Sequence, residues 1–109
     1  MPLTEIEKYL SSEAGTSALF LTNFHFADSR ISLRFEPNVD DPQISERVVR
    51  ASFTSAVIES IDEDEVERDT WPLDIIGFDC YRQGDRWKFV LNCGGVEWCW
   101  NSEWPSLVT

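Results

Sequence analysis

The sequence is short of positive charge. Its 9 Lys and Arg side chains stand against 20 Asp and Glu, which gives 9 − 20 = −11 with the single histidine neutral. A nucleic-acid backbone and an anionic membrane surface would both repel such a chain, and no apolar run is long enough to cross a bilayer. We therefore expect no nucleic-acid partner and no membrane association. Because no signal-peptide pattern opens the sequence, we expect a cytoplasmic protein.

Residues that commonly carry catalysis or bind metals are also scarce. His25 is the only histidine, and the sequence has no Cys-x-x-Cys pair, no Gly-x-Ser-x-Gly motif and no glycine-rich phosphate loop before a helix. The cysteines, Cys80, Cys93 and Cys99, are odd in number and are expected to stay reduced. Carboxylates are plentiful, but a crowded exposed run gives no reason for one pKa to separate from another. We expect no metal, no cofactor and a binding protein rather than an enzyme.

What the sequence does have is alternation of apolar and polar residues. The strongest example runs from Asp85 to Asn101 around Gly94-Gly95, and it predicts a β-hairpin with a type I′ turn at the glycines. In that register one face is apolar and the other mostly polar. The apolar face pairs Cys93 with Val96, Leu91 with Trp98 and Phe89 with Trp100; the polar face pairs Asn92 with Glu97, Val90 with Cys99 and Lys88 with Asn101.

A third strand precedes this hairpin. Ile76, Phe78 and Cys80 alternate with polar residues, and Gln83-Gly84-Asp85 is a turn signal, so we predict a three-stranded antiparallel meander from about Leu73 to Asn101. All three apolar residues are expected on the Phe89 face. The aromatic residues of that face, Trp87, Phe89, Trp98 and Trp100, are then expected to pack in the core rather than to form a stacking platform for a ligand.

The rest of the chain completes a mainly β (α+β) fold in one domain, residues 1–109. Thr4-Glu5-Ile6-Glu7 has capping-box spacing and predicts a short N-terminal helix to about Ser12. A second hairpin is expected around Asp28-Ser29, with Phe26 opposite Ile31 and Phe24 opposite Leu33. Alternation also predicts a strand over about 47–54.

An acidic run lies between Glu59 and Asp69, and we predict a solvated loop or a frayed helical turn there. It can serve only solubility, or it can dock a basic protein. Because the run leads into Trp71, it should lie at the Gly94-Gly95 end of the meander. The residues predicted to bind a basic partner are Asp62, Glu63, Asp64, Glu65, Glu67, Asp74 and Glu97, with Trp71 as an aromatic anchor.

Three segments carry a resemblance to a known family: Asn23–Phe26, Ile31–Phe35 and Val96–Trp100. They resemble the β-rich, Trp-bearing immunity proteins of bacterial polymorphic toxin systems, among them the immunity protein fifty family, over the two hairpins and about half the chain. The resemblance implies binding and neutralising a toxin encoded by a neighbouring gene, and it brings no catalytic residues with it. The alternative function is a small-molecule or carbohydrate-binding module, or an enzyme subunit, with an aromatic cleft.

Overall fold

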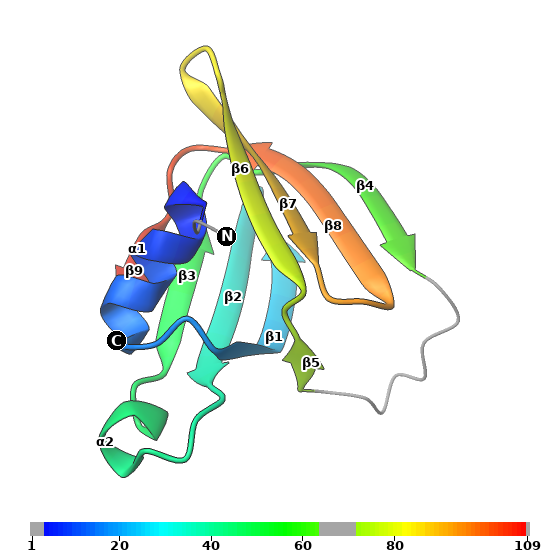
Figure 1. Cartoon of the computed structure of the whole chain (residues 1–109). Coiled ribbons are helices and arrows are strands. Elements are labelled where there is room, and N and C mark those ends of the chain that lie inside the picture. The colour runs from blue at the N-terminus through cyan, green and yellow to red at the C-terminus, as the bar shows by residue number, and fades with distance from the viewer. Residues whose placement is uncertain (1–3, 64–71, 109) are drawn as a thin grey trace.

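The computed structural model describes residues 4–63 and 72–108, and it is mainly β (Figure 1). Nine strands form two antiparallel sheets over the described residues. Sheet A has the strand order β5-β1-β2-β3-β9 and sheet B the order β4-β8-β7-β6. The elements are α1 (Glu5–Ala14), β1 (Leu19–Ala27), β2 (Arg30–Pro37), α2 (Pro42–Ser45), β3 (Val49–Phe53), β4 (Val57–Glu63), β5 (Leu73–Asp74), β6 (Gly77–Gln83), β7 (Arg86–Asn92), β8 (Val96–Ser102) and β9 (Ser106–Val108).

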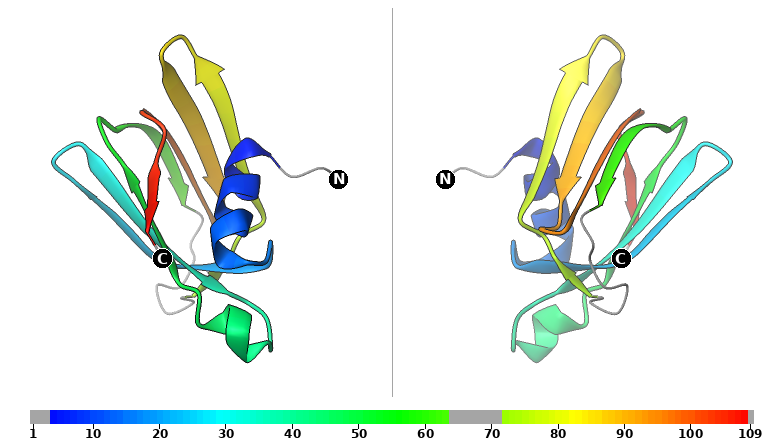
Figure 2. Two further views of the ribbon diagram at one scale, coloured as in Figure 1. Left: turned by 90° about the vertical axis from the view of Figure 1, so that its left-hand side faces the viewer. Right: turned by 90° about the vertical axis from the view of Figure 1, so that its right-hand side faces the viewer.

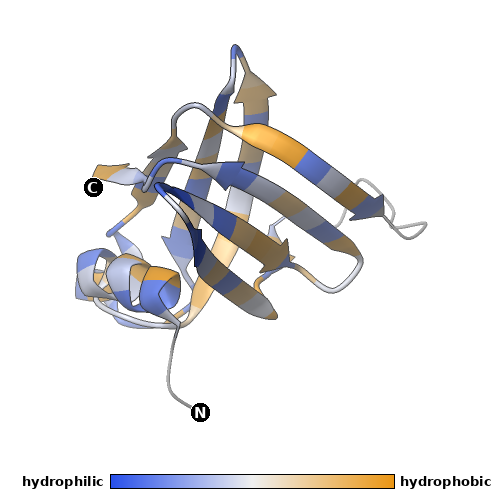
Figure 3. Ribbon diagram, turned by 90° about the horizontal axis from the view of Figure 1, so that it is seen from above, coloured by the Kyte–Doolittle hydropathy of each residue, from blue (hydrophilic) through white to orange (hydrophobic). Residues whose placement is uncertain are grey.

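The two sheets pack face to face and spread apart toward the turns of the β1–β2 and β6–β7 hairpins (Figure 2). Helix α1 lies at one side and contacts β6 of sheet B and β3 of sheet A. The strands alternate between polar and apolar residues along their length (Figure 3), as expected where one face of each sheet is buried. We call the face of each sheet that is turned away from the other sheet its outer face.

The N-terminal helix is confirmed and ends two residues later than predicted. Thr4 caps it by accepting a hydrogen bond from the Glu7 N–H at 3.3 Å, and Gly15 ends it with a left-handed φ of 79°. The carboxylate of Glu7 accepts the N–H of Phe78 at 3.4 Å, and the Thr4 hydroxyl donates to the Phe78 carbonyl at 2.5 Å. Both bonds fix the start of the helix to β6.

Both predicted hairpin registers are confirmed: Phe24 pairs with Leu33, and Phe89 with Trp100. The turn type differs from the prediction at one of the two hairpins. Asp28 and Ser29, with φ of 52° and 59°, form the type I′ turn without any glycine. At Gly94-Gly95 the type I′ prediction is wrong, because only Gly94 takes a positive φ, 81°. The Asn92 side chain accepts the Gly94 N–H at 2.8 Å, which makes an Asx-type turn.

Two further predictions are corrected. The meander begins at Gly77, not Leu73, because β5 pairs with β1 in sheet A (Leu21 with Leu73) and the chain changes sheets before β6. That change of sheet leaves Ile76 70% exposed instead of on the Phe89 face. The first part of the acidic run is also not a loop: Val57–Glu63 is β4, an edge strand that pairs with β8.

The core lies between the sheets and is largely aromatic. Phe53 of sheet A meets two side chains of sheet B edge to face, Phe89 at 4.9 Å and Trp100 at 5.1 Å between ring centroids. Phe53, Phe89 and Trp100 are all fully buried. Trp87 is only partly buried and packs against Trp104 at 4.7 Å. The aromatic residues of the meander therefore do pack in the core, as expected.

Candidate functional site

An acidic pair lies on the outer face of sheet B. Asp62 of β4 and Glu97 of β8 are direct cross-strand partners, and both are exposed. Paired residues of neighbouring strands project from the same face, so the two carboxylates lie side by side. On the other side of Glu97, the amide of Asn92 in β7 donates to the Glu97 carboxylate at 3.5 Å. We call Asp62 and Glu97 the acidic pair.

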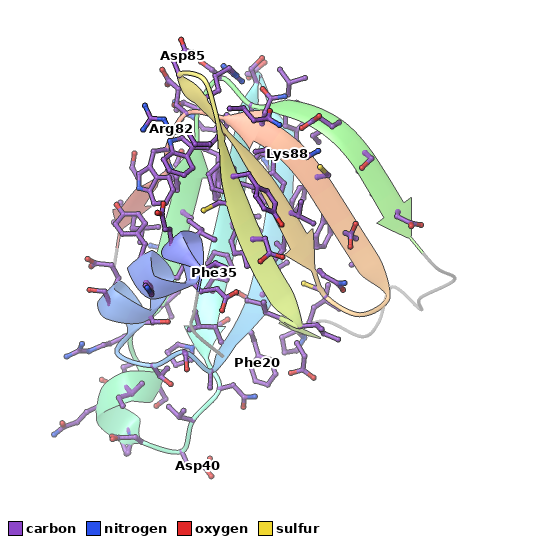
Figure 4. All side chains as sticks on the ribbon, turned by 45° about the horizontal axis from the view of Figure 1, so that its top comes forward. Phe20, Phe35, Asp40, Arg82, Asp85 and Lys88 are labelled. Carbon is purple, nitrogen blue, oxygen red and sulfur yellow. The ribbon has the colours of Figure 1, made fainter. Side chains whose placement is uncertain are left out.

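The carboxylates of the acidic pair repel each other, and no ion pair offsets this repulsion within residues 4–63 and 72–108. The single salt bridge in that part of the chain joins Arg34 to Glu36 at 4.0 Å, on sheet A. The described basic residues on the outer face of sheet B are Arg86 and Lys88. Figure 4 shows Lys88 toward the β6–β7 turn, and it pairs with Asn101, four residues along β8 from Glu97. That spacing is roughly 13 Å, beyond the ~8 Å screening length of physiological salt. Like charges directly opposite each other destabilise a sheet, so the fold does not benefit from this pair.

Negative charge also gathers at the turn between β7 and β8. Burial raises the pKa of Cys93, next to that turn, to about 12, and the charge of Asp74 adds to the rise. The N–H of Ile76, two residues after Asp74, donates to the Asn92 carbonyl at 2.8 Å, which brings the end of β5 close to this turn. Burial likewise raises the pKa of Cys80 against the lowering effect of a hydrogen bond to the Ile6 backbone, and Glu5 and Asp79 raise it further.

The structure brings some of the predicted partner-binding residues together. Asp62 and Glu97 are adjacent on the outer face of sheet B. Asp74 pairs with Phe20 of β1 and projects from the outer face of sheet A, so it does not join them in one patch. Glu63 is the last residue of β4, where its backbone pairs with Val96. The other four predicted residues lie outside the described part of the chain: Asp64, Glu65, Glu67 and Trp71.

Asp79, which was not among the predicted site residues, is a half-buried carboxylate on the same outer face. It pairs with Val90, which in turn pairs with Cys99, one row along the sheet from Glu97. The alternation of β6 could have identified it, because Gly77, Asp79 and Tyr81 all lie opposite in parity to the buried Phe78. Figure 1 shows these strands side by side, in the order β4-β8-β7-β6.

The remaining chemistry of the described residues is sparse. Nowhere in residues 4–63 and 72–108 do three or more His, Cys, Asp or Glu side chains stand where they could hold a metal ion. The three cysteines are free thiols. Within the same part of the chain, none of the helices has the length and apolar character needed to cross a membrane.

Comparison with known proteins identifies a fold but no family. No protein-family model matches the chain, and no curated protein matches it. The chain is similar to a crystal structure of an uncharacterized protein from Neisseria gonorrhoeae, with a TM-score of 0.58 and 14% sequence identity over 84% of this chain and 91% of that one. At that identity the likeness shows the shared fold alone. The resemblance to immunity proteins stays a prediction.

Proposed function

We propose that this chain is an acidic protein-binding domain that neutralises a toxin by covering a basic surface on it, as an immunity protein does. The observation that carries the proposal is the acidic pair, Asp62 beside Glu97, which is exposed and lacks an ion pair among the described residues. The resemblance of Asn23–Phe26 and Val96–Trp100 to immunity proteins supports the same function. We place its action in the cytoplasm, where a bacterium needs protection from a toxin that it makes itself.

The acidic pair suits such a partner for an electrostatic reason. A basic protein that approaches the outer face of sheet B would remove the Asp62–Glu97 repulsion and replace it with attraction. The formal net charge of −11 would speed the encounter as well. Charge of this kind acts mainly on the association rate, and buried anchors set the lifetime of the complex.

The alternative function, a ligand-binding module with an aromatic cleft, has less support. Phe89, Trp98 and Trp100 are at most 6% exposed, and they stack on one another or on aromatic residues of sheet A, as Phe24 does on Trp98 at 4.4 Å. These rings pack in the core and do not form an open cleft for a ligand. Such a module would have to use other side chains.

The test is the association rate between this chain and the product of its neighbouring gene, measured over a range of ionic strengths. The double variant Asp62→Lys/Glu97→Lys should associate about tenfold more slowly at low salt and with a flatter salt dependence. It should fold as well as the wild type, because both side chains are exposed. The matched control is Glu13→Lys/Glu46→Lys, which makes the same change of charge at exposed positions on α1 and at the end of α2.

The control should keep most of the wild-type rate. If the double variant also keeps it, the acidic pair serves solubility and does not face the partner. If the neighbouring gene's product does not bind the wild-type chain at all, the immunity function is wrong.

A further inference from the structure

The outer face of sheet A has the opposite character to that of sheet B. Its strands β1, β2 and β3 project arginines, serines, one histidine and one amide from a single surface. We call this surface the arginine face. It consists of Asn23, His25, Arg30, Ser32, Arg34, Arg50 and Ser52.

The arginine face concentrates positive charge in a chain that has little of it. Its three arginines face three acids at the margins of this side of the sheet, Asp28, Glu36 and, beyond β1, Asp74, so the outer face of sheet A is formally neutral (3 − 3 = 0). The rest of the chain carries the whole formal charge of −11. A third of the nine basic residues therefore lie on one face of one sheet, away from the acidic pair on the other sheet.

Arg34 and Arg50 are direct cross-strand partners between β2 and β3. Such partners have Cα atoms about 4.5–5.5 Å apart, so two guanidinium groups emerge side by side. Arg34 also reaches Glu36 at 4.0 Å, but their side chains are 45% and 39% exposed, and water and salt weaken such a pair. The Arg34–Arg50 pair works against the stability of the sheet, as the acidic pair does.

The surface around these arginines is hollowed, and its lining is both polar and apolar. One open hollow of about 420 Å³ is lined by Asn23, Ser32, Arg34, Arg50 and Ser52 together with the apolar Leu33, Ala51 and Val108. A second of about 420 Å³ is lined by His25, Asp28, Arg30 and Ser32. Ser32 belongs to both, so the hollows adjoin. Short side chains between the arginines leave room for a group to approach the guanidinium N–H donors.

We propose that the arginine face is a docking surface for an acidic protein, whose Asp or Glu carboxylates are bound between Arg34 and Arg50. A guanidinium binds a carboxylate through two parallel hydrogen bonds, and the serine hydroxyls and the Asn23 amide supply further donors. A carboxylate seated there would cancel the Arg34–Arg50 repulsion. Protein carboxylates fit better than nucleic acid, because a long polyanion would extend over parts of a chain that otherwise carries −11.

This inference does not rest on the toxin-neutralising function, since it concerns the other sheet and the opposite charge. The probe is a peptide of six glutamates, titrated at low salt into the whole ¹⁵N-labelled chain. We expect amide shift changes at Asn23, Ser32, Arg34, Arg50 and Ser52. The double variant Arg34→Gln/Arg50→Gln should weaken binding about tenfold, and the control Lys8→Gln/Arg47→Gln, with the same loss of charge at exposed positions, should leave it almost unchanged.

Two further measurements complete the test. The melting temperature of the Arg34→Gln/Arg50→Gln variant should be no lower than that of the wild type, because the substitutions remove the Arg34–Arg50 repulsion. A much lower melting temperature would mean that the arginines stabilise the fold, and it would overturn the proposal. Inorganic phosphate and a ten-nucleotide single-stranded DNA are then titrated in place of the peptide. Equal or tighter binding of either at the same residues, or no shift at the arginine face with the glutamate peptide, would also overturn it.

Discussion

Replacing Phe89 by alanine tests the two-sheet core most directly. Phe89 is fully buried, and four rings from both sheets and from the segment before β9 surround it. Their centroids lie 4.9 Å (Phe53), 5.6 Å (Trp100), 6.0 Å (Trp104) and 6.2 Å (Phe78) away. Emptying a buried aromatic site costs about 3–5 kcal/mol of the free energy of unfolding. We expect the upper half of that range, because rigid rings on several sides hinder collapse into the cavity and aromatic pairs of about 0.5–1.5 kcal/mol each are lost.

The effect should be large relative to the stability of the whole domain. Domains of this kind have free energies of unfolding of about 5–15 kcal/mol, and a loss of 3–5 kcal/mol lowers the melting temperature by roughly 12–25 °C at this size. Urea unfolding followed by far-UV circular dichroism measures it, since tryptophan fluorescence would itself respond to a change beside Trp100. The matched control is Phe26→Ala. Phe26 is 43% exposed near the end of β1 and should cost about 1 kcal/mol.

The comparison of the two phenylalanines decides the outcome. If Phe89→Ala costs no more than Phe26→Ala, then Phe89 is not in the centre of a core that joins both sheets. The pairing of β7 with β8 would then have to be reconsidered as well, because that register puts Phe89 and Trp100 on the inner face.

Two more predictions concern the turn between β7 and β8. Gly94→Ala should lower the free energy of unfolding in urea by about 1 kcal/mol, because Gly94 has φ 81° and an added Cβ would lie 3.3 Å from the Ile76 side chain. The control Gly77→Ala, at an open position without positive φ, should lower it less. Equal losses would contradict the turn geometry. Burial and Asp74 raise the pKa of Cys93 from 9.0 to about 12, so the folded state holds the thiol proton more tightly than the unfolded state. The contribution of this proton to the free energy of unfolding is complete below pH 9 and should be lost as the pH rises toward 12. Cys93→Ala should flatten that part of the stability–pH curve, and an unchanged curve would place the thiol in water.

The hairpins could be predicted from the sequence because their information is local. A two-residue turn between alternating strands fixes which residues face each other, and this holds whatever the turn type. Asp28-Ser29 shows the point: it gives the expected pairing of Phe24 with Leu33 through a turn that lacks glycine. The error at Gly94-Gly95 concerned the dihedral angles and left the pairing of Phe89 with Trp100 intact.

Strand β4 was missed for a physical reason. Its pairing with β8 shifts between Ile58 and Ser60, and this bulge places Ile58 and Ile61, three residues apart, opposite the inward-facing Trp100 and Trp98. The period of two is broken there. An acidic run with apolar residues three apart resembles a frayed helix or a loop, so alternation could not identify the strand.

The sheet to which a strand belongs could not be predicted either. Leu73–Asp74 and Ser106–Val108 both follow or precede meander strands along the chain, yet both join sheet A. That choice depends on contacts between residues far apart in sequence, such as Leu21 with Leu73. The same limit applies to the candidate site: local patterns predicted that acidic residues gather at one end, but the pairing of Asp62 with Glu97 comes from β4 and β8, which are not consecutive strands.

Two pairs of like charges now stand on the outer faces of the two sheets, Asp62 with Glu97 and Arg34 with Arg50. Each opposes folding, since like charges directly across a ladder cost roughly 0.2–1 kcal/mol relative to neutral residues. Solubility does not require either pair, because scattered charges would keep the chain in solution without placing like charges opposite each other. In the two binding proposals, a partner of opposite charge would turn each repulsion into attraction. Residues that bind at the expense of stability are a recurrent feature of functional surfaces, and under these proposals the two pairs would bind two partners, or two parts of one partner, that carry opposite charges.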